Sequence, residues 1–503
     1  MYLLAIDLGT TSVKVSLFDP DASVIGSYHK RVKTKISSGG GSRQDAGVWL
    51  QCVVEGVRSL TEKFPDQAAG IAGIAATGHM MGCLPVDRDG KPLFDHMLHS
   101  DTSARHEAEM INELIGSENF YQMTGNILNG SSVLPKIIWF RNNHPELYKQ
   151  TSCFLNSKDF ITGFLTGTYG NTDLSDASHS GIIDIRDRSY NTGLYQSLKL
   201  TLDKMPDLHT GTEIIGKLCR ASAKAMNLKP GIPVATGAGD GACSAIGAGA
   251  GKPGDVYCCM GTTAWIASIT SKPVFDSRQR SFNIIAGDGK AVGSYGTIQN
   301  CGRSTDFALD FFKIDSMQEF DRLAGMAPAG SLGLIYLPYL DGERGPLNDP
   351  DTQGVFFGIN TEHNQTHGLR SVLEGVAMAL RHNADVHREN GCVIDKIKLI
   401  GGGARSKVWR EIMAGTMPAT ISRVDVPPED ATTLGAAMLA GIGIGLYKDL
   451  AEATSQVQAV GETRPLQDQI QIYNNIYEIY CRLYPALKEP FHMMAEKRLR
   501  HLF

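Results

Sequence analysis

Short apolar runs alternate with glycine-rich or polar turns along most of this chain, and this pattern predicts alternating strands and helices. The N-terminus shows the pattern clearly: residues 2–6 form an apolar run, residues 13–18 alternate in polarity, and the polar turn 7–12 joins them. We therefore expect a β-hairpin with a Gly-Thr-Thr tip. Backbone amides and hydroxyls at such a tip suit phosphate oxygens, although an ordinary hairpin turn explains the same residues.

The hairpin pattern recurs in the second half of the chain. Residues 256–260 and 264–269 have the character of strands on either side of a second tip. The sequences LGTT at 8–11 and MGTT at 260–263 differ at one position, and their glycines lie 252 positions apart in a chain of 503 residues. A repeat of this kind indicates a duplicated domain with a ligand held between the copies.

A third glycine-rich segment surrounds Asp240. The apolar run 232–235 predicts a buried strand, glycines flank the aspartate on both sides, and the small residues at 242–250 favour a closely packed helix. An aspartate on a glycine-bounded turn at a strand end is placed as a general base would be. A helix N-cap is the alternative, because aspartate also favours that position.

The same patterning places the remaining elements. Helices are predicted at residues 44–63, around 136–139, at 155–170, 370–382, 406–413 and in the last thirty or so residues, and strands at 71–76, 83–86, 334–340 and 397–400. Three of the strands end in segments that suit a ligand site, namely His79 to Gly82, the polar turn 341–346 and the glycines 401–403. For Met80 and Met81, simple packing is the alternative.

Composition and charge restrict the class of protein. The hydrophobic share of 42%, the charged share of 20% and the length of 503 residues predict a globular chain with two large domains. A net charge of -5 argues against nucleic acid or an anionic membrane as a partner. The apolar runs are too short for a membrane span, and Asp7 interrupts the first one, so we expect no signal peptide. The ten scattered cysteines predict reduced thiols in a cytoplasmic protein.

Five motifs together resemble one known family. In chain order they are AIDLGTTSVK, GAGDGACSAIGAG, MGTTAW, LPYLDGERGP and IGGGARSKVW. Their order and spacing resemble the FGGY carbohydrate kinases over nearly the whole chain, and the sequence looks closest to the xylulokinases within that family. The resemblance implies an α/β fold of two actin-like, ribonuclease H-like ATPase domains, residues 1–246 and 247–503, around a central cleft. It also implies phosphorylation of a small sugar or polyol by ATP with Mg²⁺, and a possible homodimer.

The resemblance also implies roles for individual residues. Asp240 matches the general base, and Asp7 matches the acid that holds Mg²⁺ through water. The positions that match ATP contacts are Gly9, Thr10, Thr11 and Lys14, then Gly261, Thr262 and Thr263, then Gly302 and Asp306, and finally Gly402, Gly403 and Lys407. The positions assigned to the acceptor are His79, Met80, Met81, Asp101 and Asp240.

The acceptor positions depart from the xylulokinase pattern. Xylulokinases usually carry Gln-Met-His-Gly where this chain has residues 79–82, HMMG. Their Trp-Asn-Asp-Gly-Arg becomes HSDTS at residues 99–103, which loses the tryptophan and the arginine. D-xylulose is the first expected acceptor, and ribulose, other ketoses, gluconate-type acids and polyols remain open.

Other classes of protein share single features with this sequence. Gly237, Gly239 and Ala242 fit the dinucleotide fingerprint of a dehydrogenase, which leaves the second hairpin unexplained. Gly251-Lys252 begins like a P-loop but is followed by proline and lacks the earlier glycine. A non-enzymatic actin-like ATPase would share both hairpins without needing a carboxylate at position 240.

Overall fold

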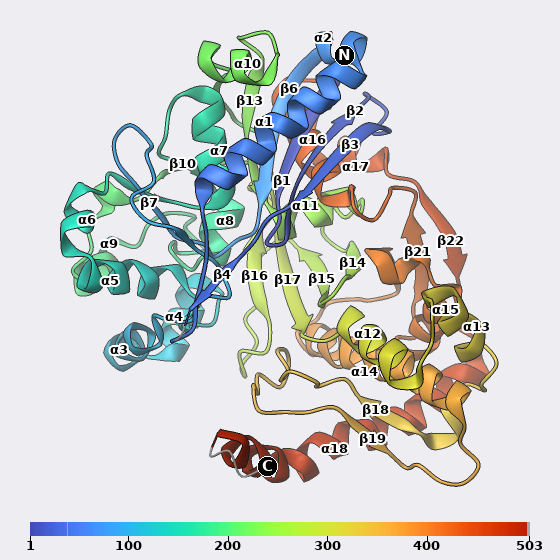
Figure 1. The fold of residues 1–503 in the computed structure, drawn as a ribbon. Helices are drawn as coiled ribbons and strands as arrows, with labels where there is room; N and C mark the ends of the chain where they lie inside the picture. The colour runs from blue at the N-terminus through green and yellow to red at the C-terminus, as the bar shows by residue number, and fades with distance from the viewer. Residues whose placement is uncertain (38, 500–503) are drawn as a thin grey trace.

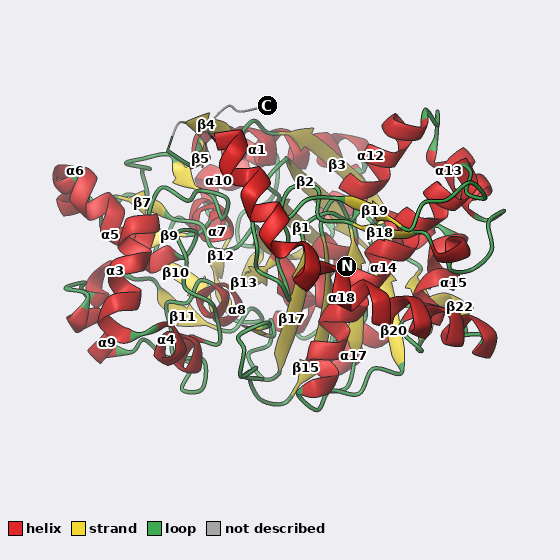
Figure 2. Cartoon of the chain, turned by 90° about the horizontal axis from the view of Figure 1, so that it is seen from below, coloured by secondary structure: helices red, strands yellow, loops and turns green. Residues whose placement is uncertain are grey.

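The computed structural model describes residues 1–37 and 39–499, which form two lobes built on two mixed β-sheets (Figure 1). The six-stranded sheet of the N-terminal lobe has the order β12-β13-β6-β1-β2-β3. The seven-stranded sheet of the C-terminal lobe has the order β16-β17-β15-β14-β20-β21-β22. Figure 2 shows the helices of the two lobes at opposite ends of the molecule, with α3, α5 and α6 at one end and α13 and α15 at the other.

The strands of the two sheets have the following bounds. The first sheet consists of β1 (Tyr2–Leu8), β2 (Ser12–Phe18), β3 (Val24–Arg31), β6 (Ile71–Gly78), β12 (Ile214–Lys217) and β13 (Pro233–Gly239). The second consists of β14 (Val256–Met260), β15 (Ala264–Thr270), β16 (Phe282–Ile285), β17 (Val292–Ile298), β20 (Lys396–Ile400), β21 (Thr420–Val424) and β22 (Ala459–Thr463). The predicted hairpins are β1–β2 and β14–β15.

The two sheets repeat one topology. In the first, β1 pairs antiparallel with β2, β2 pairs antiparallel with β3, and β1, β6 and β13 are parallel. In the second, β14, β15 and β17 make the same antiparallel series, and β14, β20 and β21 are parallel. An antiparallel edge strand, β12 or β22, completes each series. The predicted duplication, which the sequence showed only at two hairpin tips, therefore extends over both sheets.

The helices pack on the faces of these sheets. The long ones are α1 (Ala46–Lys63), α14 (Gln365–Glu389), α16 (Ala431–Gly443) and α18 (Gln467–Leu499). The others are α2 (Pro65–Ala69), α3 (Arg105–Ile115), α4 (Ser117–Thr124), α5 (Val133–Asn143), α6 (Pro145–Gln150), α7 (Ser157–Thr166), α8 (Leu174–His179), α9 (Thr192–Ser197), α10 (Arg220–Met226), α11 (Asp240–Gly247), α12 (Gly302–Phe312), α13 (Met317–Ala324), α15 (Lys407–Thr416) and α17 (Leu450–Ser455).

Short strands and 3₁₀ turns complete the described chain. They are β4 (Lys35–Ser37), β5 (Gly41–Gln44), β7 (Leu84–Val86), β8 (His96–Met97), β9 (Cys153–Leu155), β10 (Asn171–Asp173), β11 (Asp207–His209), β18 (Ile335–Leu337) and β19 (Val355–Phe357), with η1 (Leu202–Lys204), η2 (Ser331–Gly333) and η3 (Gly402–Arg405). Within the described ranges, no helix has both the length and the apolar content that a membrane crossing requires.

Side chains alternate along β1 between two hydrophobic cores. Leu4 and Ile6 are buried in a core that includes Trp49 of α1, and Leu3 and Ala5 are buried in another that includes α16. This alternation follows from the two-residue period of a strand. Because α16 follows the last parallel strand of the second sheet, its packing on β1 joins the two lobes.

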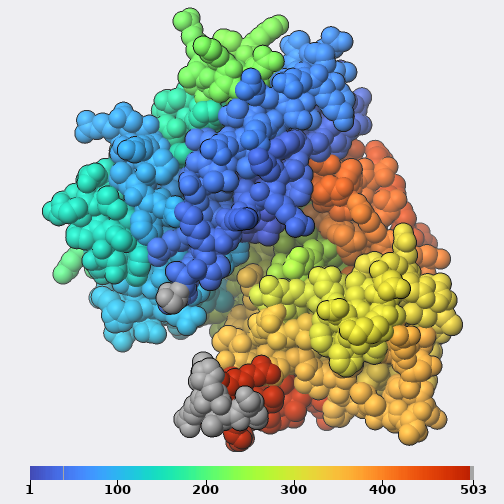
Figure 3. Space-filling model, in the orientation of Figure 1, coloured from blue at the N-terminus to red at the C-terminus, as the bar shows by residue number. Residues whose placement is uncertain are grey.

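Two helices cross between the lobes at small residues. A Cβ atom on Gly247 of α11 would lie 1.7 Å from the carbonyl oxygen of Ala431, and one on Gly435 of α16 would lie 2.0 Å from that of Cys243. Only glycine allows backbones to approach so closely. The two helices occupy equivalent places in the repeat, because α11 follows β13 and α16 follows β21. Figure 3 shows the furrow between the blue N-terminal lobe and the yellow C-terminal lobe.

Several element boundaries differ from the sequence-based expectation. The helix expected at 155–170 begins at Ser157, because Asn156 caps it, and ends before Gly167, whose φ is 78°. The strand β9 precedes it. The helix expected at 370–382 extends over Gln365–Glu389, because its buried stripe continues on both sides. The helix expected from residue 242 already begins at Asp240 and ends at Gly247.

Candidate active site

Three chain segments leave the N-terminal sheet at one edge. In the parallel strands, Leu8 of β1 pairs with Gly78 of β6, and Gly78 pairs with Gly239 of β13. The carboxyl ends of parallel strands meet at the same edge of a sheet. The first hairpin tip, the segment from His79 and the residue Asp240 therefore begin side by side.

A bulge displaces β13 just before Asp240. The pairing of β13 with β6 is irregular between Ala235 and Ala238, and Gly237 has a φ of 71°. A Cβ atom on Gly237 would lie 1.8 Å from the carbonyl oxygen of Ala76, so this position requires glycine. Gly237, three positions before the aspartate, therefore allows the strand to bend.

Asp240 is the first residue of α11, and its side chain is half-buried. Gly239 occupies the N-cap position, and the helix has no side-chain cap hydrogen bond, so the N-cap alternative is wrong. Burial raises the pKa of Asp240 to about 7, the carboxylate of Asp7 adds to the rise, and the amide of Gly241 and the charge of Lys14 oppose it. A carboxyl group with this pKa exchanges a proton readily near neutral pH.

Asp7 and Lys14 face each other across the first hairpin and form a salt bridge near its tip. Nζ of Lys14 lies 3.6 Å from Oδ2 of Asp7 and donates a hydrogen bond of 3.1 Å to the carbonyl oxygen of Glu429 in the other lobe. Burial raises the pKa of Asp7, and Lys14 opposes that rise. At the tip, Thr10 is half-buried and Thr11 is exposed, which leaves the hydroxyl of Thr11 accessible.

The second hairpin tip lies against the N-terminus of α12. The amide of Gly302 donates to the carbonyl oxygen of Gly261 at 2.9 Å, and the amide of Cys301 donates to that of Thr262 at 3.1 Å. A Cβ atom on Gly302 would lie 2.9 Å from the Gly261 oxygen, so glycine permits this approach. Thr262 is exposed and Thr263 is half-buried.

The glycine loop after β20 contacts the same tip. A Cβ atom on Gly401 would lie 2.6 Å from the carbonyl oxygen of Met260, and one on Gly403 would lie 2.9 Å from the Met260 side chain. Gly402 has open space in front of it. The structure therefore brings together the second tip, Gly302 and the glycine loop.

Two predicted ATP residues lie farther out on helices beside this group. Asp306 is exposed on α12, and Lys407 is exposed at the start of α15, where its Nζ lies 3.7 Å from Glu411. A pocket of about 430 Å³ opens beside the glycine loop, and its lining includes Ala404, Arg405 and Glu429.

The two lobes meet close to Asp240. Cys259 precedes the second tip on β14; burial raises the pKa of its thiol to about 12, the carboxylate of Asp240 adds to this rise, and Lys14 opposes it. The hydroxyls of Tyr257 and Tyr295, both from the C-terminal sheet, donate to the carbonyl oxygen of Gly241 at 3.0 and 3.1 Å. The first turn of α11 is therefore held by the C-terminal lobe.

The residues predicted to bind the phosphoryl acceptor pack against their neighbours or make hydrogen bonds within the N-terminal lobe. His79 is buried between Trp49 and His96, and its Nδ1 donates to the carbonyl oxygen of Leu8 at 2.7 Å. Burial lowers the pKa of His79 to about 4, so the ring is neutral. Met80 is buried against Gly239, whereas Met81 is half-buried with a φ of 60°.

Asp101 is fully buried, and it accepts hydrogen bonds within its own lobe. The amide of Ser42 donates to it at 3.0 Å, Nε of Arg43 at 3.3 Å and the amide of Ser103 at 3.0 Å. These bonds fix the loop that follows His99. An acceptor role for residues 79–81 and 101 stays a prediction.

Sequence reasoning missed a basic cluster beside the predicted acceptor residues. Burial lowers the pKa of His99 to about 3, and the nearby groups of His79, Arg344, Lys136 and His179 lower it further. Arg344 belongs to the C-terminal lobe and the others belong to the N-terminal lobe. The polar turn 341–346 signalled Arg344, but nothing in the sequence connected it to the histidines.

Lys136 of α5 organises the segments that carry these side chains. Its side chain is fully buried, and Nζ donates to the carbonyl oxygens of Met81 at 2.8 Å and Leu98 at 2.7 Å. Burial lowers the pKa of Lys136 to about 8. One lysine therefore ties together the two strand ends that precede Gly82 and His99.

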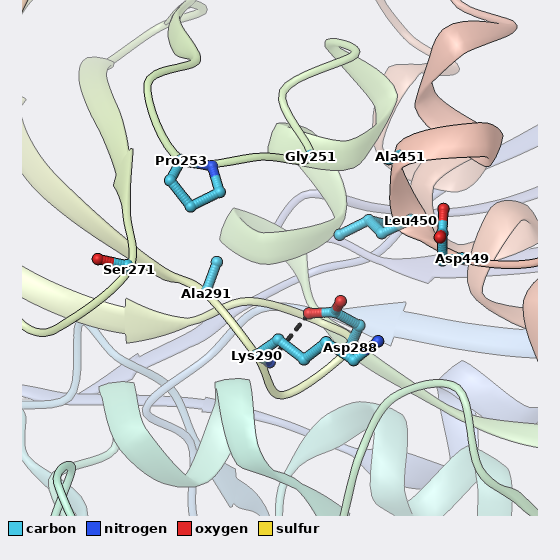
Figure 4. A pocket seen from close by; sticks show the side chains of 9 residues that line it. All are labelled: Gly251, Pro253, Ser271, Asp288, Lys290, Ala291, Asp449, Leu450 and Ala451. Carbon is cyan, nitrogen blue, oxygen red and sulfur yellow. Dashed lines mark hydrogen bonds between the residues drawn. The ribbon is translucent and has the colours of Figure 1, made fainter.

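The residues around the two tips fit a magnesium nucleotide. Exposed hydroxyls at both tips, the ammonium of Lys14 and the open approach at Gly402 suit phosphate oxygens. Asp7 supplies a carboxylate, the kind of group that holds Mg²⁺. A second pocket, of about 280 Å³, is lined by residues that include Asp288, Lys290 and Asp449 (Figure 4), and its lining contains no residue of the two tips or of the glycine loop after β20.

Two repeated α/β lobes, hairpin tips rich in donors and a carboxylate of raised pKa at their junction are the features expected of a phosphotransferase. The comparisons with known proteins agree. The N-terminal domain model of the FGGY family of carbohydrate kinases matches residues 2–247, and the C-terminal domain model matches residues 256–444. The chain therefore belongs to the FGGY family of carbohydrate kinases, and its fold is the two-domain, actin-like ATPase fold of that family. The dehydrogenase, P-loop and non-enzymatic readings are excluded.

Three relatives illustrate the similarity. A xylulose kinase of Bacillus subtilis is 29% identical over 490 residues, which cover 97% of each chain. The solved structure of a xylulose kinase from Lactobacillus acidophilus has a TM-score of 0.91 and 26% identity, covering 98% of this chain and 99% of that one. A gluconate kinase from the same organism has a TM-score of 0.91 and 25% identity, with the same coverage. Overall similarity therefore does not separate the two acceptors.

Proposed function

We propose that the chain transfers the γ-phosphoryl group of ATP to a hydroxyl of a small ketose, with D-xylulose as the first candidate. Asp240 is the general base. The observation that carries this proposal is the position of Asp240 at the sheet edge where the first tip begins, close to Cys259 of the second hairpin, with its pKa raised to about 7. Such a group is ionised often enough to accept a proton and basic enough to hold it.

The chemical step follows from this arrangement. The acceptor hydroxyl loses its proton to the carboxylate of Asp240 while its oxygen forms a bond to the γ-phosphorus. The bond between that phosphorus and the bridging oxygen breaks, and ADP leaves. Lys14 and the amides and hydroxyls of the tips stabilise the charge on the phosphates. Mg²⁺, held by Asp7 through water, would neutralise phosphate charge when bound.

An aldonate such as gluconate is the second candidate acceptor. Arg344 lies close enough to His99 and His179 to lower the pKa of both rings. The guanidinium is a permanent positive charge beside neutral imidazoles, and it suits a carboxylate. The similarity to a gluconate kinase supports this alternative.

A coupled assay of ADP release tests the proposal. The wild-type protein is supplied with Mg·ATP and, in turn, pentuloses, hexuloses, aldonates, polyols and no acceptor. We expect acceptor-dependent ADP release with one class of acceptor, and no such release from the Asp240→Asn variant. ADP release that is the same with and without every acceptor would contradict a sugar kinase.

Three further expectations belong to the same proposal. The division into residues 1–246 and 247–503 is supported by the limits of the two family models. A cytoplasmic location is supported by the ten cysteines, all of which are free thiols. A homodimer stays a prediction.

A further inference from the structure

A side chain from a different element holds the residue that precedes the proposed base. The amide of Gly239 donates a hydrogen bond of 2.9 Å to Oγ of Ser175, which lies on α8. Both residues are buried, and Ser175 is fully inaccessible to solvent. A buried backbone amide requires a partner, and here the partner is a hydroxyl and not a neighbouring strand.

The bulge in β13 explains why a side chain is needed. Regular pairing with β6 is interrupted after Ala235, and the chain turns through positive φ at Gly237. Pairing with β6 resumes at Ala238 and Gly239, but the amide of Gly239 is bonded to Ser175 and not to β6. This hydrogen bond fixes the strand end at the peptide next to Asp240.

The hydroxyl of Ser175 is itself oriented by a buried ion pair. It donates its proton to Oδ2 of Asp173, which also accepts from the amide of Ser175 at 2.7 Å. Oδ1 of Asp173 lies 3.0 Å from Nζ of Lys158, and both side chains are buried. Because the proton of Ser175 is committed to Asp173, a lone pair of its oxygen faces the amide of Gly239.

The carboxylates around Lys158 make this arrangement rigid. Lys158 also pairs with Asp159, and Asp176 accepts from Nδ2 of Asn156 at 2.5 Å. Breaking a buried ion pair leaves an uncompensated charge, which is strongly destabilising. The support of Ser175 is therefore a fixed part of the N-terminal lobe.

We propose that Ser175 is a positioning residue for the proposed base, and that it acts by anchoring Gly239 so that the carboxylate of Asp240 faces the acceptor hydroxyl. This inference rests on the proposed role of Asp240. Ser175 touches neither substrate, so its loss affects the geometry of proton transfer and not the binding of ATP. A displacement of about 1 Å is enough to cost roughly 100-fold in rate.

The test compares two serines on the same helix. Ser175→Ala removes the oxygen that accepts the hydrogen bond from Gly239. Ser175→Cys keeps a side chain of similar size but offers only a weak hydrogen-bond acceptor. Ser178→Ala is the matched control: its hydroxyl is equally buried, and it accepts from the amide of Ile285 at 3.0 Å on β16. Kinetic constants, melting temperature and hydrogen exchange at the amide of Gly239 are measured for all three variants.

We expect both Ser175 variants to lose about 10- to 100-fold in kcat with the KM for ATP unchanged. Exchange at Gly239 should accelerate at least about tenfold, because its hydrogen bond is lost. Ser178→Ala and Ser175→Ala should lower the melting temperature by similar amounts. The kcat of Ser178→Ala, however, should stay within about twofold of wild type. If Ser175→Ala does not fold, Ser175→Cys gives the result.

The outcomes separate this inference from the proposed function. Near-wild-type kcat in the Ser175 variants, or a kcat that falls equally in Ser178→Ala, would overturn it. Wild-type protein without acceptor-dependent ADP release would instead contradict the proposed function. In that case, exchange at Gly239 still decides whether Ser175 anchors the strand end, and unchanged exchange refutes the anchor.

Discussion

Replacing Asp240 by asparagine should separate catalysis from stability. Asparagine keeps the size of the side chain and one oxygen acceptor, but it carries no charge and does not accept the proton of the acceptor hydroxyl. We expect kcat to fall by about 10²–10⁴-fold, the usual contribution of a general base. The wild-type rate should rise with pH, because only the ionised carboxylate accepts a proton, with a midpoint near the pKa of about 7.

The same substitution should stabilise the protein, and the structure gives the magnitude. Folding raises the pKa of Asp240 from its ordinary value of 3.8 to about 7. At 1.36 kcal/mol for each pKa unit, the ionised carboxylate costs at most ~4 kcal/mol of stability. Since the side chain is only half-buried, solvent screening reduces this cost to about 1–3 kcal/mol.

The sign of the pH dependence follows from linkage. A raised pKa means that the folded protein binds the proton more tightly, so this contribution to stability is fully present below 3.8 and is lost as the pH rises through about 7. Asparagine does not titrate. Its advantage over wild type should therefore be small at about pH 4 and largest at about pH 8.

Thermal or urea denaturation of both proteins without ligands, at about pH 5 and about pH 8, measures this difference. Asp45→Asn is the control, because Asp45 caps the distant helix α1. That variant should keep the stability of wild type within about 0.5 kcal/mol at both pH values, because asparagine caps a helix about as well as aspartate. An Asp240→Asn variant that is less stable than wild type at the higher pH, or whose advantage does not change with pH, would refute the half-buried, proton-binding carboxyl described above.

Three other substitutions test separate parts of the site. Gly302→Ala should raise the KM for ATP about tenfold, because its Cβ would lie 2.9 Å from the oxygen of Gly261 and displace the second tip. Initial rates at varied ATP concentration measure the KM, and an unchanged value would contradict this prediction. Lys136→Met should lower the free energy of unfolding by about 3 kcal/mol, because two buried carbonyl oxygens lose their hydrogen-bond donor. Denaturation measures the loss, and replacing a surface lysine should not cause it. Arg344→Gln should raise the KM for the phosphoryl acceptor about tenfold and leave the KM for ATP unchanged. It should also raise the pKa of His99, as followed by NMR. Equal effects on the KM of both substrates would contradict a role of Arg344 in binding the phosphoryl acceptor.

The sequence predicted the parts of the site that local pattern determines. Both hairpins, the glycine loop after β20 and the aspartate after β13 follow from residue type and spacing within a few positions, because turn geometry restricts these positions to glycine, threonine and aspartate. The duplicated topology could be predicted for the same reason, since each copy begins with a hairpin and the two four-residue tips differ at one position.

The acceptor side depends on contacts between segments far apart in the chain. His79 looked available at a strand end, but the fold buries it between Trp49 and His96. Arg344 approaches His99 from the other lobe, 245 positions away. Neither relation leaves a periodic signal in the sequence, because side-chain proximity across lobes is decided by tertiary packing.

An aspartate lies at the start of the helix that follows the third parallel strand in each lobe, and the two aspartates have different surroundings. Asp240 begins α11 after β13, and Asp430 immediately precedes α16 after β21. Asp430 is buried, and its Oδ1 accepts from the hydroxyls of Ser16 at 2.8 Å and Ser27 at 2.7 Å, so this carboxylate joins the C-terminal lobe to the N-terminal hairpin. Asp240 instead lies half-buried beside Asp7 and Lys14. At Asp240, burial and the neighbouring negative charge of Asp7 raise the pKa. One copy therefore provides a carboxylate that links the lobes, and the other provides the proposed general base.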